Sequence, residues 1–161
     1  MVPDTLLAEA EELLTACRAK HVMLATAESC TGGLIAAILT GIAGSSDVVD
    51  RGFIAYSNAA KNEIIGVPMA LMQTHGAVSE EVARAMAEGA LSRSRATIAV
   101  SVTGVAGPGG SSVEKPVGLT CFGLAKRGQA IISERTVFPG DRTGIRIAMV
   151  ARAFLMIRAQ V

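Results

Sequence analysis

Apolar residues recur along the chain with two spacings, which predict helices and strands in alternation. Spacings of three and four residues, together with capping residues, predict helices over residues 3–20, 31–41, 58–65, 79–94 and 141–160. Short apolar runs rich in β-branched residues predict strands over residues 22–27, 48–57, 96–103, 117–126 and 129–138. Both element types therefore occur from one end of the chain to the other.

The order of these elements indicates the fold class. Helices are interleaved with strands, and the last two strands flank Arg127-Gly128, a pair that is typical of a hairpin. Such interleaving predicts an α/β protein, a three-layer α/β/α sandwich around a mixed, mostly parallel sheet. No linker or internal repeat divides the pattern, so residues 1–161 are expected to form a single domain.

The composition narrows the class of partner. Half of the residues are hydrophobic but only 3% are aromatic, so the core must be built mainly from aliphatic side chains. The formal net charge is +1 and the arginines are scattered without interleaved aromatic residues, which argues against nucleic-acid binding. The uncharged run from Ser29 to Ser46 is interrupted by glycines and hydroxyls, so it predicts a buried helix and no membrane span. The composition therefore indicates neither a nucleic acid nor a membrane as the partner.

The cysteines and histidines suggest neither a disulfide framework nor a metal site. Cys17, Cys30 and Cys121 are odd in number and widely spaced, with no Cys-x-x-Cys pair, and His21 and His75 stand alone. We therefore expect no metal and no cofactor. A reducing cytoplasm is the simplest expected location, and acidic residues near the N-terminus argue against a secretion signal.

The most informative stretch is the turn between the first predicted strand and the second predicted helix. It reads Ala-Glu-Ser-Cys-Thr-Gly-Gly over residues 27–33. Unpaired N–H groups and the positive end of a helix dipole at such a turn favour an anion or an oxyanion. Candidate substrate-binding groups are therefore the backbones of Cys30, Thr31, Gly32 and Gly33.

Ser29 in this turn is the candidate nucleophile, because active sites in open α/β sheets tend to lie at strand ends. The alternative is that Ser29 only caps the helix. Cys30 is either a small buried apolar residue or a rival nucleophile.

A serine nucleophile needs a base, and the next predicted strand-to-helix junction offers Tyr56 and Lys61. Lysine can act as a base when burial lowers its pKa. Alternatively, Tyr56 is an ordinary strand residue and Lys61 is a solvated lysine on the surface.

The motif Ser112-Val-Glu-Lys115 is a competing candidate, because it fits the Ser-x-x-Lys pattern of a serine nucleophile with a lysine base. That pattern needs a helical turn to bring its two ends together. Glycines precede it and Pro116 follows it, so the flanks argue against a helix and against a catalytic role.

The loop that follows the strand 96–103 is rich in glycine and carries Pro108. It is either a flexible crossover or a second backbone cradle for phosphate or ribose, with candidate contacts at Thr103, Gly104, Gly107 and Gly109.

Two arginines lie one helical turn apart near the start of the last predicted helix. Arg142 and Arg146 either pair with a substrate phosphate or remain solvated.

Six short segments follow one another along the chain in a characteristic order and spacing. They are Thr26-Ala-Glu-Ser-Cys-Thr-Gly-Gly, Ala55-Tyr-Ser-Asn-Ala-Ala-Lys61, Ala77-Val-Ser-Glu-Glu-Val-Ala, Ser101-Val-Thr-Gly-Val-Ala-Gly-Pro-Gly-Gly, Glu114-Lys-Pro-Val-Gly and Phe138-Pro-Gly-Asp-Arg142. Together they span essentially the whole sequence, and they resemble the CinA C-terminal domain family of nicotinamide-nucleotide amidases (nicotinamide mononucleotide deamidases), in its stand-alone form.

The resemblance implies an amidohydrolase that converts nicotinamide mononucleotide and water to nicotinic acid mononucleotide and ammonia. By motif position, Ser29 would be the nucleophile, Lys61 the general base and Tyr56 an assisting or orienting residue. Thr103 and Arg142 would contact or position the substrate. The resemblance also implies a three-layer fold, no metal, and a homo-oligomer that is a dimer or larger.

Two other functions remain open. One is a non-catalytic nucleotide-binding module of the same fold, and the other is a hydrolase of another small amide that uses the same serine. Residues 111–113 differ from the family's pattern, which leaves the loop shape and the substrate preference open.

Overall fold

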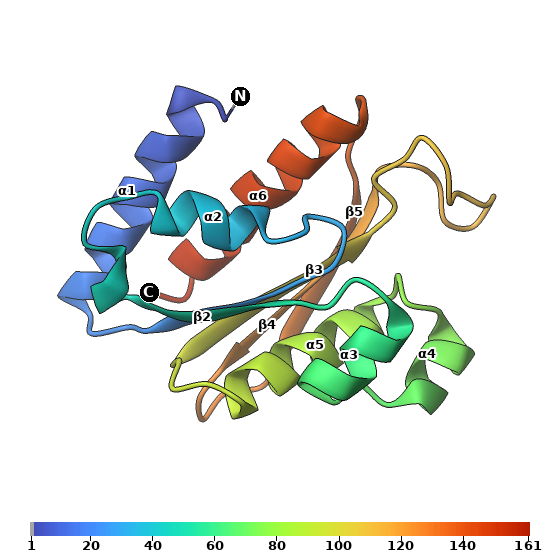
Figure 1. Ribbon diagram of the computed structural model, residues 1–161, viewed down its shortest axis with the longest axis horizontal. Helices are drawn as coiled ribbons and strands as arrows, with labels where there is room; N and C mark the ends of the chain where they lie inside the picture. The colour runs from blue at the N-terminus through green and yellow to red at the C-terminus, as the bar shows by residue number, and fades with distance from the viewer. Residues whose placement is uncertain (1) are drawn as a thin grey trace.

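The computed structural model describes residues 2–161 and contains one five-stranded sheet between two layers of helices (Figure 1). The strands are β1 (Leu24–Glu28), β2 (Val49–Ile54), β3 (Ile98–Gly104), β4 (Leu119–Lys126) and β5 (Ile132–Val137). The helices are α1 (Asp4–Ala19), α2 (Leu34–Thr40), α3 (Asn58–Ile65), α4 (Met69–His75), α5 (Glu80–Ser92) and α6 (Arg142–Arg158), with a short 3₁₀ turn, η1, at Ser45–Asp47.

The sheet is mixed, with the strand order β2-β1-β3-β4-β5. β1 pairs in parallel with both β2 and β3, whereas β4 pairs antiparallel with both β3 and β5. Four of the five strands within residues 2–161 therefore run in one direction and β4 runs in the other, although the neighbouring pairs divide evenly between parallel and antiparallel. The predicted α/β fold class is confirmed, and so is the hairpin at Arg127-Gly128.

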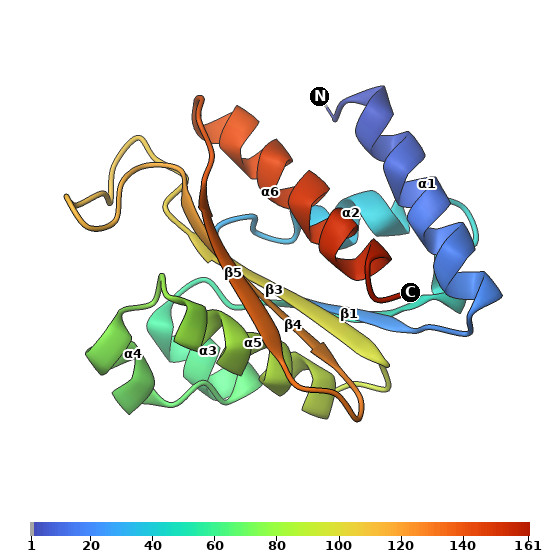
Figure 2. The same cartoon turned by 180° about the vertical axis from the view of Figure 1, so that it is seen from behind.

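The helices α1, α2 and α6 cover one face of the sheet, and α3, α4 and α5 cover the other, as Figures 1 and 2 show from opposite sides. Each layer has its own aliphatic core against the sheet. Small residues let neighbouring elements approach closely. A Cβ at Gly123 of β4 would collide with the Ala83 carbonyl of α5, and within the same helical layer one at Gly89 of α5 would collide with the Ile65 carbonyl of α3. The composition, rich in glycine and poor in aromatic residues, thus matches the close packing of the helices.

Two parts of the helical prediction were wrong. α4 was missed, because Met72 is its one buried residue and a seven-residue helix leaves almost no apolar period to detect. α2 begins at Leu34 and not at residue 31, because Gly32 and Gly33 adopt positive φ angles of 60° and 96°, which a right-handed helix does not allow. Each of the five predicted strands is also longer than, or displaced from, the strand that forms.

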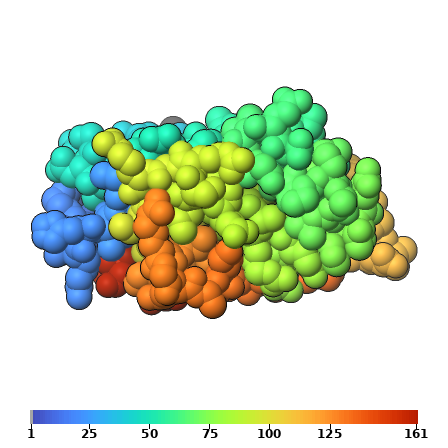
Figure 3. Space-filling model, turned by 90° about the horizontal axis from the view of Figure 1, so that it is seen from below, coloured from blue at the N-terminus to red at the C-terminus, as the bar shows by residue number. Residues whose placement is uncertain are grey.

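The loop between β3 and β4 projects from one end of the molecule (Figures 1 and 3). Val113 in this loop is fully exposed. Within residues 2–161, each helix is too short or too polar to cross a lipid bilayer.

Candidate active site

The carboxyl ends of the three parallel strands meet at one edge of the sheet and place the candidate residues together. Ser29 follows β1 directly, Tyr56 lies two residues after β2, and Thr103 lies near the end of β3. A cavity of about 230 Å³ opens at this edge. It is lined by Ser29, Cys30, Tyr56, Ser57, Asn58, Lys61, Ala77, Val78, Thr103 and Gly104. This edge is where open α/β sheets usually bind ligands.

Lys61, in the first turns of α3, points into this edge and reaches Ser29. Its Nζ lies 3.0 Å from Ser29 Oγ and donates to the Tyr56 carbonyl at 2.9 Å. The side chain is only 1% exposed and forms no ion pair with any residue of 2–161. Burial disfavours the charged amine and lowers the pKa of Lys61 below its ordinary value of 10.5. An amine that burial makes easier to deprotonate, placed beside a hydroxyl, is a candidate base within reach of its proton.

Backbone hydrogen bonds, one within the turn and one to β3, fix the turn that carries Ser29. The Gly32 N–H donates to the Ser29 carbonyl at 3.0 Å, and the Ser29 N–H donates to the Val102 carbonyl at 3.0 Å. In the described part of the chain, the N–H groups of Cys30 and Thr31 donate to no other oxygen. The Cys30 amide, whose residue lines the cavity, is therefore a candidate donor to an oxyanion that forms next to Ser29, whereas Thr31 is fully buried and lies outside the cavity lining.

Cys30 is a weak candidate for the nucleophile. Its thiol is buried and donates to Met149 Sδ at 3.4 Å. Burial raises the pKa of Cys30 to about 12, so the reactive thiolate is scarce at neutral pH. Gly104 is required beside it, because a Cβ there would lie 3.2 Å from Cys30 Sγ and 2.8 Å from the Leu119 carbonyl.

Glu28, the last residue of β1, has a role that sequence reasoning missed. Its carboxylate is fully buried and accepts five hydrogen bonds of 2.7–3.2 Å. The donors are the hydroxyls of Thr26 and Thr31 and the N–H groups of Gly33, Ile35 and Ala36. The start of α2 thus binds an anion as expected, but that anion is a side chain of the same protein. The sequence feature that could have indicated this role is the position of Glu28, a lone charged residue at the end of an apolar strand.

Of the glycine residues proposed as binding groups, Gly104 lines the cavity, whereas Gly32, Gly33, Gly107 and Gly109 fall outside its lining. The Gly32 and Gly33 N–H groups are already bonded within the turn, and Thr31 directs its hydroxyl at Glu28. Gly107 lies beyond the cavity and accepts from Arg142 Nη1 at 2.6 Å through its carbonyl. Gly109 lies in the exposed loop.

Tyr56 and Thr103 line the cavity, and Arg142 contacts Tyr56 beside it. Tyr56 is 60% exposed, and its hydroxyl accepts a long hydrogen bond of 3.4 Å from Arg142 Nη2. Arg142 therefore bridges the start of α6, the Gly107 carbonyl and Tyr56. The Thr103 hydroxyl donates to the Ala77 carbonyl at 2.8 Å, which leaves its oxygen free to accept from a ligand in the cavity.

The other candidate motif does not form a comparable pair. Ser112 Oγ accepts from the Lys115 backbone, while Lys115 Nζ donates to the His75 carbonyl at 2.9 Å. Its lysine is therefore not positioned as a base for its serine. Among residues 2–161, His, Cys, Asp and Glu side chains form no group of three or more that could hold a metal ion.

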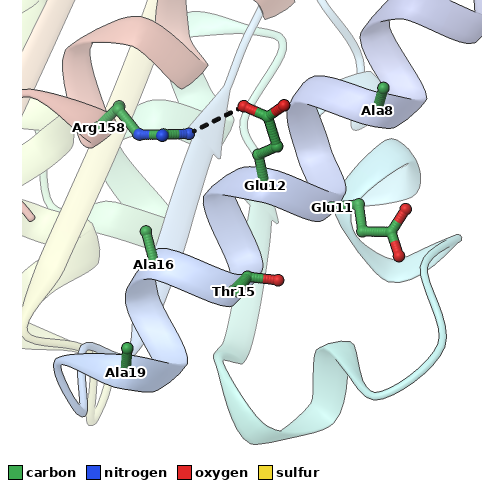
Figure 4. Close-up of a pocket in the computed structure, with 7 residues that line it drawn as sticks. All are labelled: Ala8, Glu11, Glu12, Thr15, Ala16, Ala19 and Arg158. Atoms are coloured by element: carbon green, nitrogen blue, oxygen red, sulfur yellow. Dashed lines mark hydrogen bonds and ion pairs between the residues drawn. The ribbon is translucent and has the colours of Figure 1, made fainter.

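A larger hollow of about 560 Å³ lies between α1 and the end of α6 (Figure 4). Its polar groups are Glu11, Glu12, Thr15 and Arg158, and Glu12 and Arg158 already form an ion pair of 3.3 Å. This hollow lies about 25 Å along α6 from the Arg142 end. It holds no nucleophile paired with a base, in contrast to the cavity at Ser29.

Comparison with known structures places this fold in an established group. The chain matches the competence/damage inducible protein CihA from Agrobacterium tumefaciens with a TM-score of 0.96 and 48% identity, over 99% of this chain and 97% of that chain. It matches the competence damage-inducible protein A (ComA) from Klebsiella pneumoniae with a TM-score of 0.92 and 33% identity, over 96% of this chain and 95% of that one.

Curated relatives extend the comparison to sequence. The chain is 49% identical over 136 residues to the nicotinamide-nucleotide amidohydrolase PncC of Enterobacter agglomerans, which covers 84% of this chain and 83% of that protein. It is 53% identical over 135 residues to a CinA-like protein of Mycolicibacterium vanbaalenii, and it spans only 32% of that longer relative. The family model of the CinA C-terminal domain matches residues 7–161. The chain therefore belongs to the CinA C-terminal domain family.

Proposed function

We propose that this protein is an amidohydrolase that converts nicotinamide mononucleotide and water to nicotinic acid mononucleotide and ammonia. The observation that carries the proposal is the contact of 3.0 Å between Lys61 Nζ and Ser29 Oγ inside a buried pocket. A nucleophile and a base within hydrogen-bond reach are what hydrolysis of a carboxamide through a covalent intermediate requires.

In the first half of the reaction, Ser29 Oγ attacks the carboxamide carbon and its proton passes to the neutral amine of Lys61. The carbonyl oxygen gains negative charge, and the N–H group of Cys30 in the cavity lining supplies a donor for it. Lys61 then returns the proton to the amide nitrogen, the carbon–nitrogen bond breaks and ammonia leaves. An ester on Ser29 remains, and Lys61 is neutral again.

In the second half, a water molecule attacks this ester and gives its proton to Lys61. The bond between the acyl carbon and Ser29 Oγ breaks, and Lys61 returns the proton to Ser29. The product is a carboxylic acid, which ionises at neutral pH. One amide and one water are consumed, and the side chains return to their starting state.

The size and charge of the site support a pyridine nucleotide as the substrate. The cavity of about 230 Å³ is smaller than the range of about 300–1,000 Å³ that is usual for whole ligands of drug size. It suits the carboxamide-bearing ring, with the sugar and phosphate outside its mouth. Arg142 lies there beside Tyr56 and can pair with the phosphate. The name of the Enterobacter agglomerans relative points to the same substrate class.

The test is ammonia release from nicotinamide mononucleotide by the purified protein. Ser29→Ala is expected to reduce turnover by at least about 10³-fold, because it removes the attacking atom. Cys17→Ala, which changes a buried thiol on α1, is the control and should retain turnover. Binding of the nucleotide without ammonia release, or faster release from an unrelated small amide, would contradict the proposal.

A further inference from the structure

Two oppositely charged side chains, Glu28 and Arg146, contact Thr31 in the turn between β1 and α2. The Glu28 carboxylate accepts from the Thr31 hydroxyl at 2.7 Å, and Arg146 Nη2 donates to the Thr31 carbonyl at 2.7 Å. Glu28 comes from the end of β1, whereas Arg146 comes from the first turns of α6, 115 residues further along the chain than Thr31. The turn is therefore fixed from within the sheet and from a separate helix.

These contacts exceed what capping a short helix requires. α3 and α5 are each capped by one neutral serine hydroxyl, which accepts one backbone N–H. α2 has only seven residues, yet it has a fully buried carboxylate with five donors. Burying a charge is costly even when it is well bonded. Arg146 Nε is in addition buried with no hydrogen-bond partner among residues 2–161. Both costs point to a function for the turn beyond helix stability.

We propose that Glu28 is a positioning residue for the reaction, acting through Thr31 and assisted by Arg146. Its carboxylate holds the turn of residues 29–32 so that Ser29 Oγ faces Lys61 and Cys30 stays in the lining of the cavity. It touches neither the substrate nor the reacting atoms. This inference rests on the proposed role of Ser29 as the nucleophile.

The same arrangement excludes the start of α2 as a phosphate site. The N–H groups of Gly33, Ile35 and Ala36 already donate to Glu28. A second anion there would find no free donor and would be repelled by the buried carboxylate. The substrate phosphate is therefore directed to the side of the cavity where Arg142 lies.

The test uses the reactivity of Ser29 itself, so that it does not depend on the natural substrate. A fluorophosphonate forms a bond between Ser29 Oγ and phosphorus, fluoride leaves, and the serine proton passes to Lys61. The rate of this labelling is followed by intact mass and located by peptide mapping. Glu28→Gln keeps the shape of the side chain but removes its charge. It also replaces one accepting oxygen with an NH₂ group, which would face the N–H and O–H donors that now bind Glu28. We expect it to slow labelling by about 10- to 100-fold, as a small misplacement of reacting groups does.

The matched control is Thr97→Val at the opposite end of the sheet. It also removes a polar side chain that makes two contacts, since Thr97 Oγ1 accepts from the Met23 N–H and donates to the Met23 carbonyl. It should lower the melting temperature while leaving the labelling rate within about twofold, because it lies away from the turn. The labelling of Glu28→Gln should keep the wild-type pH midpoint with a lower plateau, since Lys61 is unchanged.

The outcomes separate this inference from the proposed function. A wild-type protein that is not labelled at Ser29 overturns both. If the wild type is labelled at Ser29 but Glu28→Gln is labelled as fast as Thr97→Val, only the positioning role of Glu28 is overturned. If Glu28→Gln does not unfold cooperatively, Thr31→Val carries the test, because it removes only the hydroxyl that Glu28 holds. Thr31→Val should slow labelling by several-fold, and an unchanged rate contradicts the inference.

Discussion

The two strand-to-helix turns that build the site are opposite in character. The β1–α2 turn, residues 29–33, carries Ser29 and is held by the buried charge of Glu28. The β2–α3 turn, residues 55–57, is open, with Tyr56 60% exposed and Ser57 accepting one N–H at the start of α3. Yet the open turn leads to the buried Lys61, which crosses to the closed turn and reaches Ser29.

This difference shows how the site holds Ser29 in a fixed position and still lets a substrate reach it. The nucleophile lies on the turn whose hydrogen bonds are satisfied internally, so its position does not depend on a ligand. The base is held by a backbone carbonyl of the other turn, that of Tyr56, while the exposed side chains there leave a way in for the substrate. The changes that follow test this division, beginning with the largest expected effect.

Replacing Lys61 should remove the link between the two turns. Lys61→Met keeps most of the apolar stem but cannot accept the proton of Ser29, so kcat/KM for nicotinamide mononucleotide should fall by about 10²- to 10⁴-fold. Lys126→Met is the matched control, because Lys126 Nζ donates to the Gln160 carbonyl at the far end of β4. Ammonia release by the two variants measures the effect, and equal rates would remove Lys61 from the mechanism.

The burial of Lys61 should also appear in the pH dependence of stability. Its pKa is lowered in the folded protein from 10.5, so between the two values the unfolded chain binds more protons than the folded one. The free energy of unfolding should therefore rise with pH in that window, by up to about 1.4 kcal/mol per pH unit from this group. Urea denaturation of wild type and Lys61→Met at several pH values measures this contribution. A wild-type slope no steeper than that of Lys61→Met would show that Lys61 is not buried as described.

The smallest effect is expected from the side chain of Tyr56. Tyr56→Phe keeps the backbone carbonyl that holds Lys61 and loses only the contact of 3.4 Å with Arg142. A single long, exposed hydrogen bond contributes little, so KM should rise by about two- to threefold with kcat nearly unchanged. Steady-state kinetics separates the two parameters. A loss in kcat approaching that of Lys61→Met would place the Tyr56 hydroxyl in the chemistry and contradict this division.

Much of the fold was predictable from the sequence, because its strands and longer helices have strong apolar periods. The short helix α4 was not, since tertiary packing of one buried residue, Met72, stabilises what its own pattern does not indicate. The motifs and strand ends predicted candidate residues, and the structure brings Ser29, Tyr56 and Lys61 together at one cavity, but their environment was not predictable. The burial of Lys61 depends on how α3 packs over the end of β1, and no local pattern encodes that.

The environment of Glu28, unlike that of Lys61, is encoded by nearby residues in the sequence. Its partners all lie within eight residues in the sequence, so the information was local. From the sequence, the β1–α2 turn was interpreted as an open anion site because its glycines and the helix start indicate free N–H donors. The acceptor that binds these donors is Glu28, and glutamate usually lies on the surface. A charged residue at the end of an otherwise apolar strand should be considered first as the partner of the helix that follows.

The central claim is that Ser29 carries the acyl group during turnover, and trapping that intermediate tests it most directly. A reaction with nicotinamide mononucleotide is quenched in acid during turnover, digested and analysed by mass spectrometry. We predict an ester of the nicotinoyl nucleotide on the peptide that contains Ser29 in the wild type, and none in Ser29→Ala. Turnover by Ser29→Ala at the wild-type rate, with no adduct on the wild-type peptide, would contradict the claim.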